Sequence, residues 1–210
     1  MMKTKIKSKT VVILVLVFAV IAVWLVRFIY LNVNSEHTVI EIYNQGEFVE
    51  YGDNFFYRSR EQRNGYSIKV VSAKLMTIED FLPTIGMTYD EYVTMSEEQS
   101  TYIVSYVLDV DIILKNTDST EGNFDRLDTR VNALNFSFQS DDLLFDYMYP
   151  DLGGSFSFKV RENTEHEMHI PYVLIESDEQ CFDMDSLMKK DLYLNITQYP
   201  VKKMIRLNLE

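Results

Sequence analysis

The first pattern along the chain is an apolar run from Val11 to Leu31, in which 20 of 21 residues are apolar. As a helix that rises about 1.5 Å per residue, this run reaches roughly 31 Å, the thickness of a bilayer's hydrocarbon core. It predicts one transmembrane helix over residues 11–31. We expect an uncleaved signal anchor, since the run exceeds the roughly 7 to 15 residues of a cleaved signal's apolar core. The alternative is a signal peptide cleaved after Ala22.

The residues that flank this run predict its orientation. Four lysines precede it, and the positive-inside rule then places residues 1–10 in the cytoplasm as a basic tail. Amphipathic side chains near the other end suit the outer interface. The predicted membrane-interface residues are Lys3, Lys5, Lys7, Lys9, Trp24, Arg27 and Tyr30. We therefore expect a single-pass protein of the cell membrane, with a short linker at 32–37 and an extracytoplasmic domain at 38–210.

Beyond the linker, apolar positions recur with period two, which is typical of half-buried strands. The pattern is clearest over residues 101–116, where every second residue from Tyr102 to Leu114 is apolar. The polar residues of this stretch fall on the other face: Thr101, Ser105, Asp109, Asp111 and Lys115. One face of this strand is expected in the core and the other in solvent. Weaker alternation marks residues 38–44, 48–51, 66–75, 134–138, 156–160, 168–174, 192–199 and 201–209. These runs predict a mainly β domain, a two-layer sandwich.

One segment, residues 77–98, breaks the alternation. It carries two helix-start signatures, Thr77 with Asp80 and Thr88 with Glu91, each followed by apolar residues. Pro83 separates them. We expect a short helical insertion that caps one end of the sandwich, with an irregular loop as the alternative.

The net charge of the chain limits the kinds of molecule that it could bind. The whole chain carries a net charge of −12, and since residues 1–30 contribute five positive charges and no acid, the remainder carries −17. Such a domain repels phosphate backbones, which argues against nucleic-acid binding. It favours partners with basic patches.

Acidic residues are the candidate metal ligands. Asp109 and Asp111 lie two apart on the polar face of the longest strand pattern, and an acidic, turn-rich loop follows at residues 116–125. Calcium prefers such oxygens, although the loop lacks the order of an EF-hand. The candidate calcium ligands are Asp109, Asp111, Asp118, Glu121 and Asp125. His166 and His169 are three apart in a strand pattern, so they should face opposite sides and are not expected to share a metal.

No motif identifies a reaction. Gly153 and Gly154 precede Ser155 without the order of a nucleophile elbow, and a turn between strands is the expected role of the two glycines. Cys181, the single cysteine, has no identifiable histidine partner and cannot form an internal disulfide. We predict no catalytic residue and no cofactor.

Three stretches, GYSIKVVSAKL at 65–75, TYIVSYVLDVDIILKNTD at 101–118 and FSFKV at 156–160, carry a resemblance. With the lysine-flanked anchor, they resemble small bacterial membrane-anchored proteins of unknown function that have an immunoglobulin-like outer domain. In such domains a long strand often ends in a Lys-Asn pair before an acidic loop, as at Lys115-Asn116 here. The resemblance implies an immunoglobulin-like antiparallel β-sandwich and an outer location, and it implies no site residue.

The expected function is a non-catalytic binding or accessory module, held at the membrane and recognising a protein or envelope component. The first alternative is a calcium-dependent adhesion or sensing domain, suggested by the acidic loops. The second is a cell-envelope hydrolase, which would need a pocket with converging carboxylates.

Overall fold

The computed structural model describes residues 8–33, 39–52, 64–99, 101–120, 122–126, 129–174, 182–198 and 201–210. It separates into two compact units, Met1–His37 and Thr38–Glu210. The first unit contains α1 (Ser8–Val33), whose stretch from Val11 to Val33 is long and apolar enough to cross a membrane. This helix fits the predicted anchor. Of its interface residues, Trp24 stacks on Phe28 with ring centroids 5.4 Å apart.

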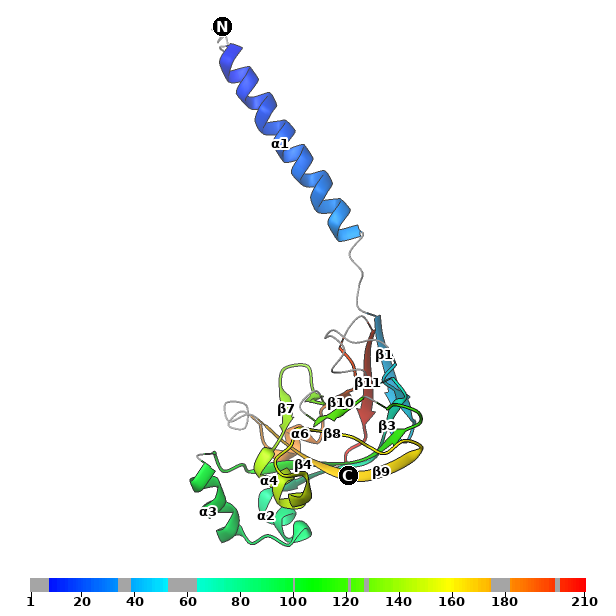
Figure 1. Ribbon diagram of the computed structural model, residues 1–210. Helices are drawn as coiled ribbons and strands as arrows, with labels where there is room; N and C mark the ends of the chain where they lie inside the picture. Colours follow the sequence, from blue (N-terminus) through cyan, green and yellow to red (C-terminus); the bar gives the residue numbers. More distant parts are fainter. Residues whose placement is uncertain are drawn as a thin grey trace. The chain divides into compact units, whose positions relative to one another are not determined.

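The second unit is built on one large mixed sheet (Figure 1). Its strands are β1 (Val39–Asn44), β2 (Val49–Glu50), β3 (Tyr66–Thr77), β4 (Tyr106–Asn116), β6 (Val131–Asn132), β7 (Ser137–Ser140), β9 (Thr164–Leu174), β10 (Leu192–Asn195) and β11 (Val201–Leu207). Within the described residues the order across the sheet is β1-β11-β10-β6-β7-β9-β4-β3-β2. The prediction of a mainly β domain is confirmed.

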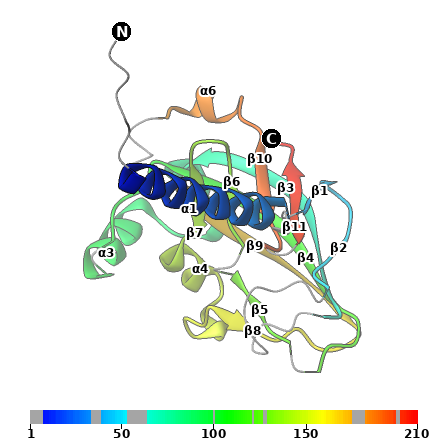
Figure 2. The ribbon, with the colours of Figure 1, turned by 90° about the horizontal axis from the view of Figure 1, so that it is seen from above.

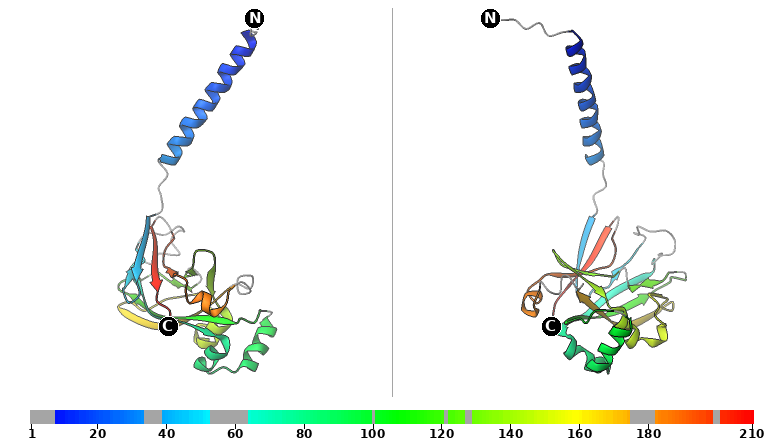
Figure 3. Two further views of the ribbon diagram at one scale, coloured as in Figure 1. Left: turned by 180° about the vertical axis from the view of Figure 1, so that it is seen from behind. Right: turned by 90° about the vertical axis from the view of Figure 1, so that its left-hand side faces the viewer.

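The sheet is mixed because β1 pairs with β11 in parallel, whereas the other neighbouring strands pair antiparallel. Figure 3 shows β1 and β11 side by side from two directions. The predicted fully antiparallel sandwich is therefore wrong at this pair. A period-two pattern identifies a strand and its buried face, but it does not specify the neighbour or the direction of that neighbour.

The two ends of the sheet come together. β1 and β2 are consecutive pieces of chain at opposite ends of the strand order, joined by a turn in which Gly46 has φ of 92°. Gly46 N donates to Val70 O at 2.9 Å, and Ala73 of β3 forms a parallel bridge with Leu209 beyond β11. A bulge between Val70 and Ser72 lies at this meeting point. The sheet thus curls back on itself around its main core.

Helices cover part of the outer face of the sheet. They are α2 (Ile78–Phe81), the 3-10 helix η2 (Leu82–Ile85), α3 (Tyr89–Gln99) and α4 (Asp142–Met148), and Figure 1 shows them at one end of the long strands. Thr77 caps α2 by accepting from Asp80 N at 3.1 Å, and Thr88 accepts from Glu91 N at 3.3 Å. Both helix starts therefore lie where the sequence indicates.

The described residues of the domain form two hydrophobic clusters, one on each face of β4. The larger one fills the inside of the curled sheet and includes Leu108, Val110 and Ile112 of β4, all fully buried. The smaller one lies under the helices and contains Val107 of β4 and Val173 of β9. The face of β4 predicted to be solvated is therefore covered at Val107, because the helices pack against it.

The remaining elements lie beyond this sheet or connect its strands. They are β5 (Phe124–Asp125), β8 (Ser157–Phe158), the 3-10 helix η4 (Pro150–Leu152) and α6 (Met184–Leu187). Figure 2 shows β5 and β8 as a two-stranded ribbon next to α4. Gly153 and Gly154, with φ of 58° and 71°, form the predicted turn before β8.

Candidate functional site

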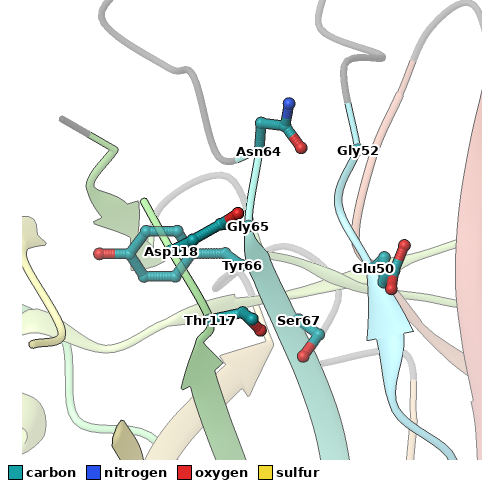
Figure 4. Close-up of a pocket in the computed structure, with 8 residues that line it drawn as sticks. All are labelled: Glu50, Gly52, Asn64, Gly65, Tyr66, Ser67, Thr117 and Asp118. Carbon is teal, nitrogen blue, oxygen red and sulfur yellow. The ribbon is translucent and has the colours of Figure 1, made fainter. Parts of the chain in front are cut away.

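A polar pocket of about 240 Å³ opens where β2, β3 and the loop after β4 meet (Figure 4). Its lining residues are Glu50, Gly52, Asn64, Gly65, Tyr66, Ser67, Thr117 and Asp118. Figure 4 shows Ser67 between Thr117 and Glu50, in agreement with the order of the strands. Two carboxylates, one amide and three hydroxyl side chains, including that of Tyr66, are thus among the residues that border one small space.

The loop that carries Asp118 is held by the side chain of Asn116. Asn116 Nδ2 donates to Val160 O at 2.7 Å and to Ser119 O at 2.9 Å, and Asn116 Oδ1 accepts from Ser119 N at 2.8 Å. Asn116 is 1% exposed, so these bonds are shielded from water. The Lys-Asn pair noted in the sequence therefore has a physical role, since its asparagine folds the acidic loop back over the sheet.

Tyr66 supports the same loop from below. Its hydroxyl donates to Gly122 O at 3.0 Å and accepts from Val160 N at 3.2 Å. Burial raises the pKa of the Tyr66 hydroxyl. Tyr66 is therefore a fixed neutral support under the pocket.

Gly65 allows Asp118 to approach β3. Gly65 has φ of 85°, and a Cβ placed there would lie 2.2 Å from Asp118 Oδ1 and 3.0 Å from Ser119 N. A larger residue would thus be strained in its backbone and would push Asp118 away. The glycine keeps this carboxylate at the edge of the pocket.

The side chains that line the polar pocket are suited to binding a small polar ligand. Carboxylate and hydroxyl oxygens accept hydrogen bonds from ammonium groups or sugar hydroxyls, and they are also the oxygens that calcium prefers. A neighbouring cation, Lys203, donates from Nζ to Glu50 O at 2.7 Å. No imidazole or thiol is among the lining residues of the pocket.

A second cluster brings together three residues singled out in the sequence. On the outer face, Asp109 Oδ2 lies 3.0 Å from His169 Nδ1, and Asp111 Oδ1 lies 4.0 Å from His169 Nε2. The hydrogen bond to Asp109 raises the pKa of His169, and burial raises the pKa of Asp111. Both ring nitrogens therefore face carboxylates, an arrangement that suits a structural ion pair.

A third cluster, around Arg126, was not predicted. Arg126 is fully buried, and its Nη1 donates to Ser140 Oγ at 2.7 Å and lies 2.8 Å from Asp142 Oδ1. Its guanidinium lies 4.4 Å from the ring centroid of Phe145 and 5.0 Å from that of Phe156. No sequence pattern surrounds this arginine, because its partners come from β7, α4 and the loop before β8.

The structure describes four of the five candidate calcium ligands, and they lie on β4, in the loop after it and in β5. Asp109 and Asp111 lie on the outer face of β4, whereas Asp118 lies in the loop after β4, at the edge of the polar pocket. Asp125 is in β5, and Glu121 lies outside the described residues. Within the part of the chain that the structure describes, no three His, Cys, Asp or Glu side chains are grouped to hold a metal ion.

The remaining residues singled out in the sequence are His166, Cys181 and the N-terminal lysines. His166 is exposed opposite Leu114, on the face of β9 away from His169, as the strand spacing indicates. Cys181 and the lysines at 3, 5 and 7 lie outside the described residues, and no side chain is described for Lys9.

The comparisons with known proteins identify a family but no function. No curated protein and no solved structure matches this chain. Residues 40–203 match the family described as Domain of unknown function (DUF5028). The match begins in β1 and ends in β11, so it includes the strands that close the sheet, the polar pocket and the helices. The chain belongs to the DUF5028 family.

Proposed function

We propose that this protein is a membrane-anchored, non-catalytic binding module whose second unit recognises a protein or envelope component outside the cytoplasm. The polar pocket of Figure 4 carries this proposal. Glu50 and Asp118 border it with negative charge, while Ser67 and Thr117 offer hydroxyls. Its occupant would be a small polar group with a positive charge, such as an amine of an envelope component.

The location follows from the anchor. Four lysines before the apolar run that starts at Val11 favour a cytoplasmic N-terminus, and residues 38–210 would then lie on the opposite side of the membrane. A binding module held there would act on partners within reach of the membrane surface.

The finer fold assignment is part of the same proposal. The curled sheet encloses one main core, and the first strands pair with both the last strand and β3. These features support an immunoglobulin-like sandwich in which the two facing layers are parts of one continuous sheet. An experimental structure in which β11 and β3 belong to two facing layers would agree with this assignment, whereas an open, flat sheet would contradict it.

The pocket can be tested by photo-cross-linking of the full-length protein in its native membranes. A photoreactive residue replaces Thr117 at the pocket edge or, as a control, Lys189, an exposed residue after α6 that does not line the pocket. We expect a discrete adduct from position 117 that is absent from position 189.

Charge variants then test whether the pocket selects this adduct. The double variant Glu50→Gln/Asp118→Asn should abolish the adduct at position 117. The matched variant Glu162→Gln/Asp185→Asn removes the same charge from exposed sites and should leave it intact. An adduct of equal intensity in both double variants would contradict the proposal.

A calcium-dependent role is the second candidate, because the pocket is lined by oxygens and includes Asp118. If calcium binds there, millimolar calcium should raise the unfolding temperature of the full-length protein, and Asp118→Asn should remove the increase. An unchanged unfolding temperature would rule this candidate out and leave the amine-binding proposal standing.

A further inference from the structure

The helices at the other end of β3 form a second surface that the proposed pocket does not use. A groove of about 320 Å³ lies between α3 and α4, and it is lined by Asp90, Glu91, Thr94, Met95 and Tyr147. Figure 1 shows α2, α3 and α4 together at this end of the sheet. The groove volume is at the lower limit of roughly 300 Å³ for ligand sites, which suits one or two side chains of a partner.

The groove combines an apolar floor with an acidic edge. Met95 and Tyr147 are half-buried and pack against the smaller hydrophobic cluster, whereas Asp90 and Glu91 are exposed. On α3 the four lining residues fall at positions i, i+1, i+4 and i+5, so they share one helical face.

Hydrogen bonds fix the walls of the groove. Tyr147 donates from its hydroxyl to Gly86 O at 3.2 Å, which ties α4 to the turn before α3. Tyr92 is buried and accepts from Val104 N at 3.1 Å, which ties α3 to the segment before β4. The groove is therefore preformed, so a partner would not have to order it.

The negative charge at the edge is also fixed. Glu91 accepts from Thr88 N and Thr88 Oγ1, each at 2.8 Å. The hydrogen bond from the Thr88 backbone lowers the pKa of Glu91, so this carboxylate stays ionised at neutral pH.

The helical segments at this end of the domain are acidic and contain no basic residue. Residues 78–99 contain six carboxylates and residues 142–152 contain three, and neither segment contains Lys, Arg or His. Arg126 offsets part of this charge, because its guanidinium lies 2.8 Å from Asp142 and 4.0 Å from Asp146, both on α4, whereas the six carboxylates of residues 78–99 remain. A second copy of this surface, an anionic lipid or an anionic polymer would be repelled here.

We propose that the groove between α3 and α4 binds a short cationic segment of a partner protein, with an apolar side chain on Met95 and Tyr147 and flanking Lys or Arg beside Asp90 and Glu91. Charge complementarity selects this occupant. The surface is separate from the polar pocket, so it goes beyond the function proposed above and can fail without it.

The probe is the peptide Ac-Lys-Leu-Arg-Phe-Lys-amide, titrated into full-length protein in phosphatidylcholine nanodiscs with ¹³C-methyl-labelled methionine. The Met95 signal, assigned by its loss in Met95→Leu, should shift and saturate. Empty nanodiscs and Ac-Glu-Leu-Glu-Phe-Glu-amide are the controls. A Met95 signal that does not move, or that moves equally with the acidic peptide, would overturn the proposal.

Matched variants separate docking from general attraction to an acidic protein. Asp90→Asn should weaken peptide binding up to about fivefold, the range of an exposed ion pair, while Glu98→Gln on the same helix should not. Met95→Ala, followed by peptide anisotropy, should weaken binding about tenfold if the apolar floor contributes. Equal weakening by Asp90→Asn and Glu98→Gln would also overturn the proposal. If no cross-linked adduct formed at position 117 of the polar pocket, the outcome of this peptide experiment at the groove would not change.

Discussion

Two charged clusters of the domain differ mainly in their exposure to water. Arg126 is fully buried between Phe145 and Phe156, and both of its carboxylate partners are part-exposed, whereas His169 is half-exposed beside Asp109. A buried cation has lost its hydration and depends on its partners and packing, while an exposed one retains water as an alternative partner. We therefore expect Arg126 to determine whether this part of the domain folds and His169 to adjust its stability with pH.

The largest effect should come from Arg126→Ala. Removing this side chain leaves a cavity between two aromatic rings and takes a donor from Ser140, so unfolding should become easier by about 3–5 kcal/mol. Urea unfolding of the full-length protein measures it, with Arg206→Ala as the control because Arg206 pairs with Asp191 in solvent. Equal urea midpoints for the two variants would contradict the expectation that the buried arginine stabilises the domain more than the exposed one.

Arg126→Met separates the volume of this side chain from its charge. Methionine fills much of the space, and Asp142 and Asp146, whose side chains are 53% and 39% exposed, can be hydrated after the arginine is lost. The expected loss is about 1–2 kcal/mol, clearly less than for alanine. If both substitutions cost the same, the charge and not the packing is what stabilises the cluster.

The next effect concerns Tyr172, which extends the buried cluster. Its hydroxyl donates to Thr129 Oγ1 at 2.8 Å, and Thr129 Oγ1 in turn donates to Arg126 O at 2.6 Å. Tyr172→Phe should cost about 1 kcal/mol of unfolding free energy. Tyr147→Phe, which removes a bond nearer the surface, is the control and should cost less.

A pH effect should come from His169. Because its hydrogen bond to Asp109 raises its folded pKa above about 6.5, the stabilisation is complete below that pH and is lost as pH rises through the folded pKa. NMR titration of the imidazole should give a value above 6.5 that falls in Asp109→Asn. In His169→Gln the decline of stability above pH 6.5 should be weaker. An imidazole pKa at or below 6.5 in the unmodified protein would show that Asp109 does not stabilise the protonated form of His169.

The smallest effect should come from the exposed pair of Lys115 and Glu165, 3.1 Å apart with side chains 43% and 49% exposed. Lys115→Ala should change the unfolding free energy by less than about 0.5 kcal/mol, since solvent and salt screen the pair. Urea midpoints at low and high salt measure this. If Lys115→Ala lowered the unfolding free energy as much as Tyr172→Phe, the exposure of a side chain would not determine the size of its effect on stability.

The sequence predicts the position of most strands because alternation reports which residues are buried. The runs at 66–75 and 168–174 correspond to β3 and β9, and the capping residues Thr77 and Thr88 mark two helix starts. Strand order and the parallel pair were not predictable, since they depend on contacts distant in sequence. α4 was missed although Asp141 precedes an apolar run and caps it by accepting from Leu144 N at 2.8 Å. That signature could have identified it.

Sequence reasoning could relate residues only where they are neighbours within one strand. Asp109 and Asp111 were singled out as a pair on one face, but the partner of both, His169, comes from β9, and strand spacing indicated only that it faces away from His166. Arg126 had no local signal, because arginine in a short polar segment is usually exposed. The pocket depends on Gly65 and Asn116, whose roles follow from backbone geometry that composition does not report.

The parallel pairing of β1 with β11 also has a consequence for biosynthesis. β1 is the first strand made, yet the strand beside it is the last, with Val39 paired to Val201. During translation β1 therefore waits without its partner, and its apolar Ile40 and Ile42, still exposed in the folded domain, are open to other chains. Such distant pairing slows folding. A chain that lacks β11 would therefore leave this edge of the sheet unpaired.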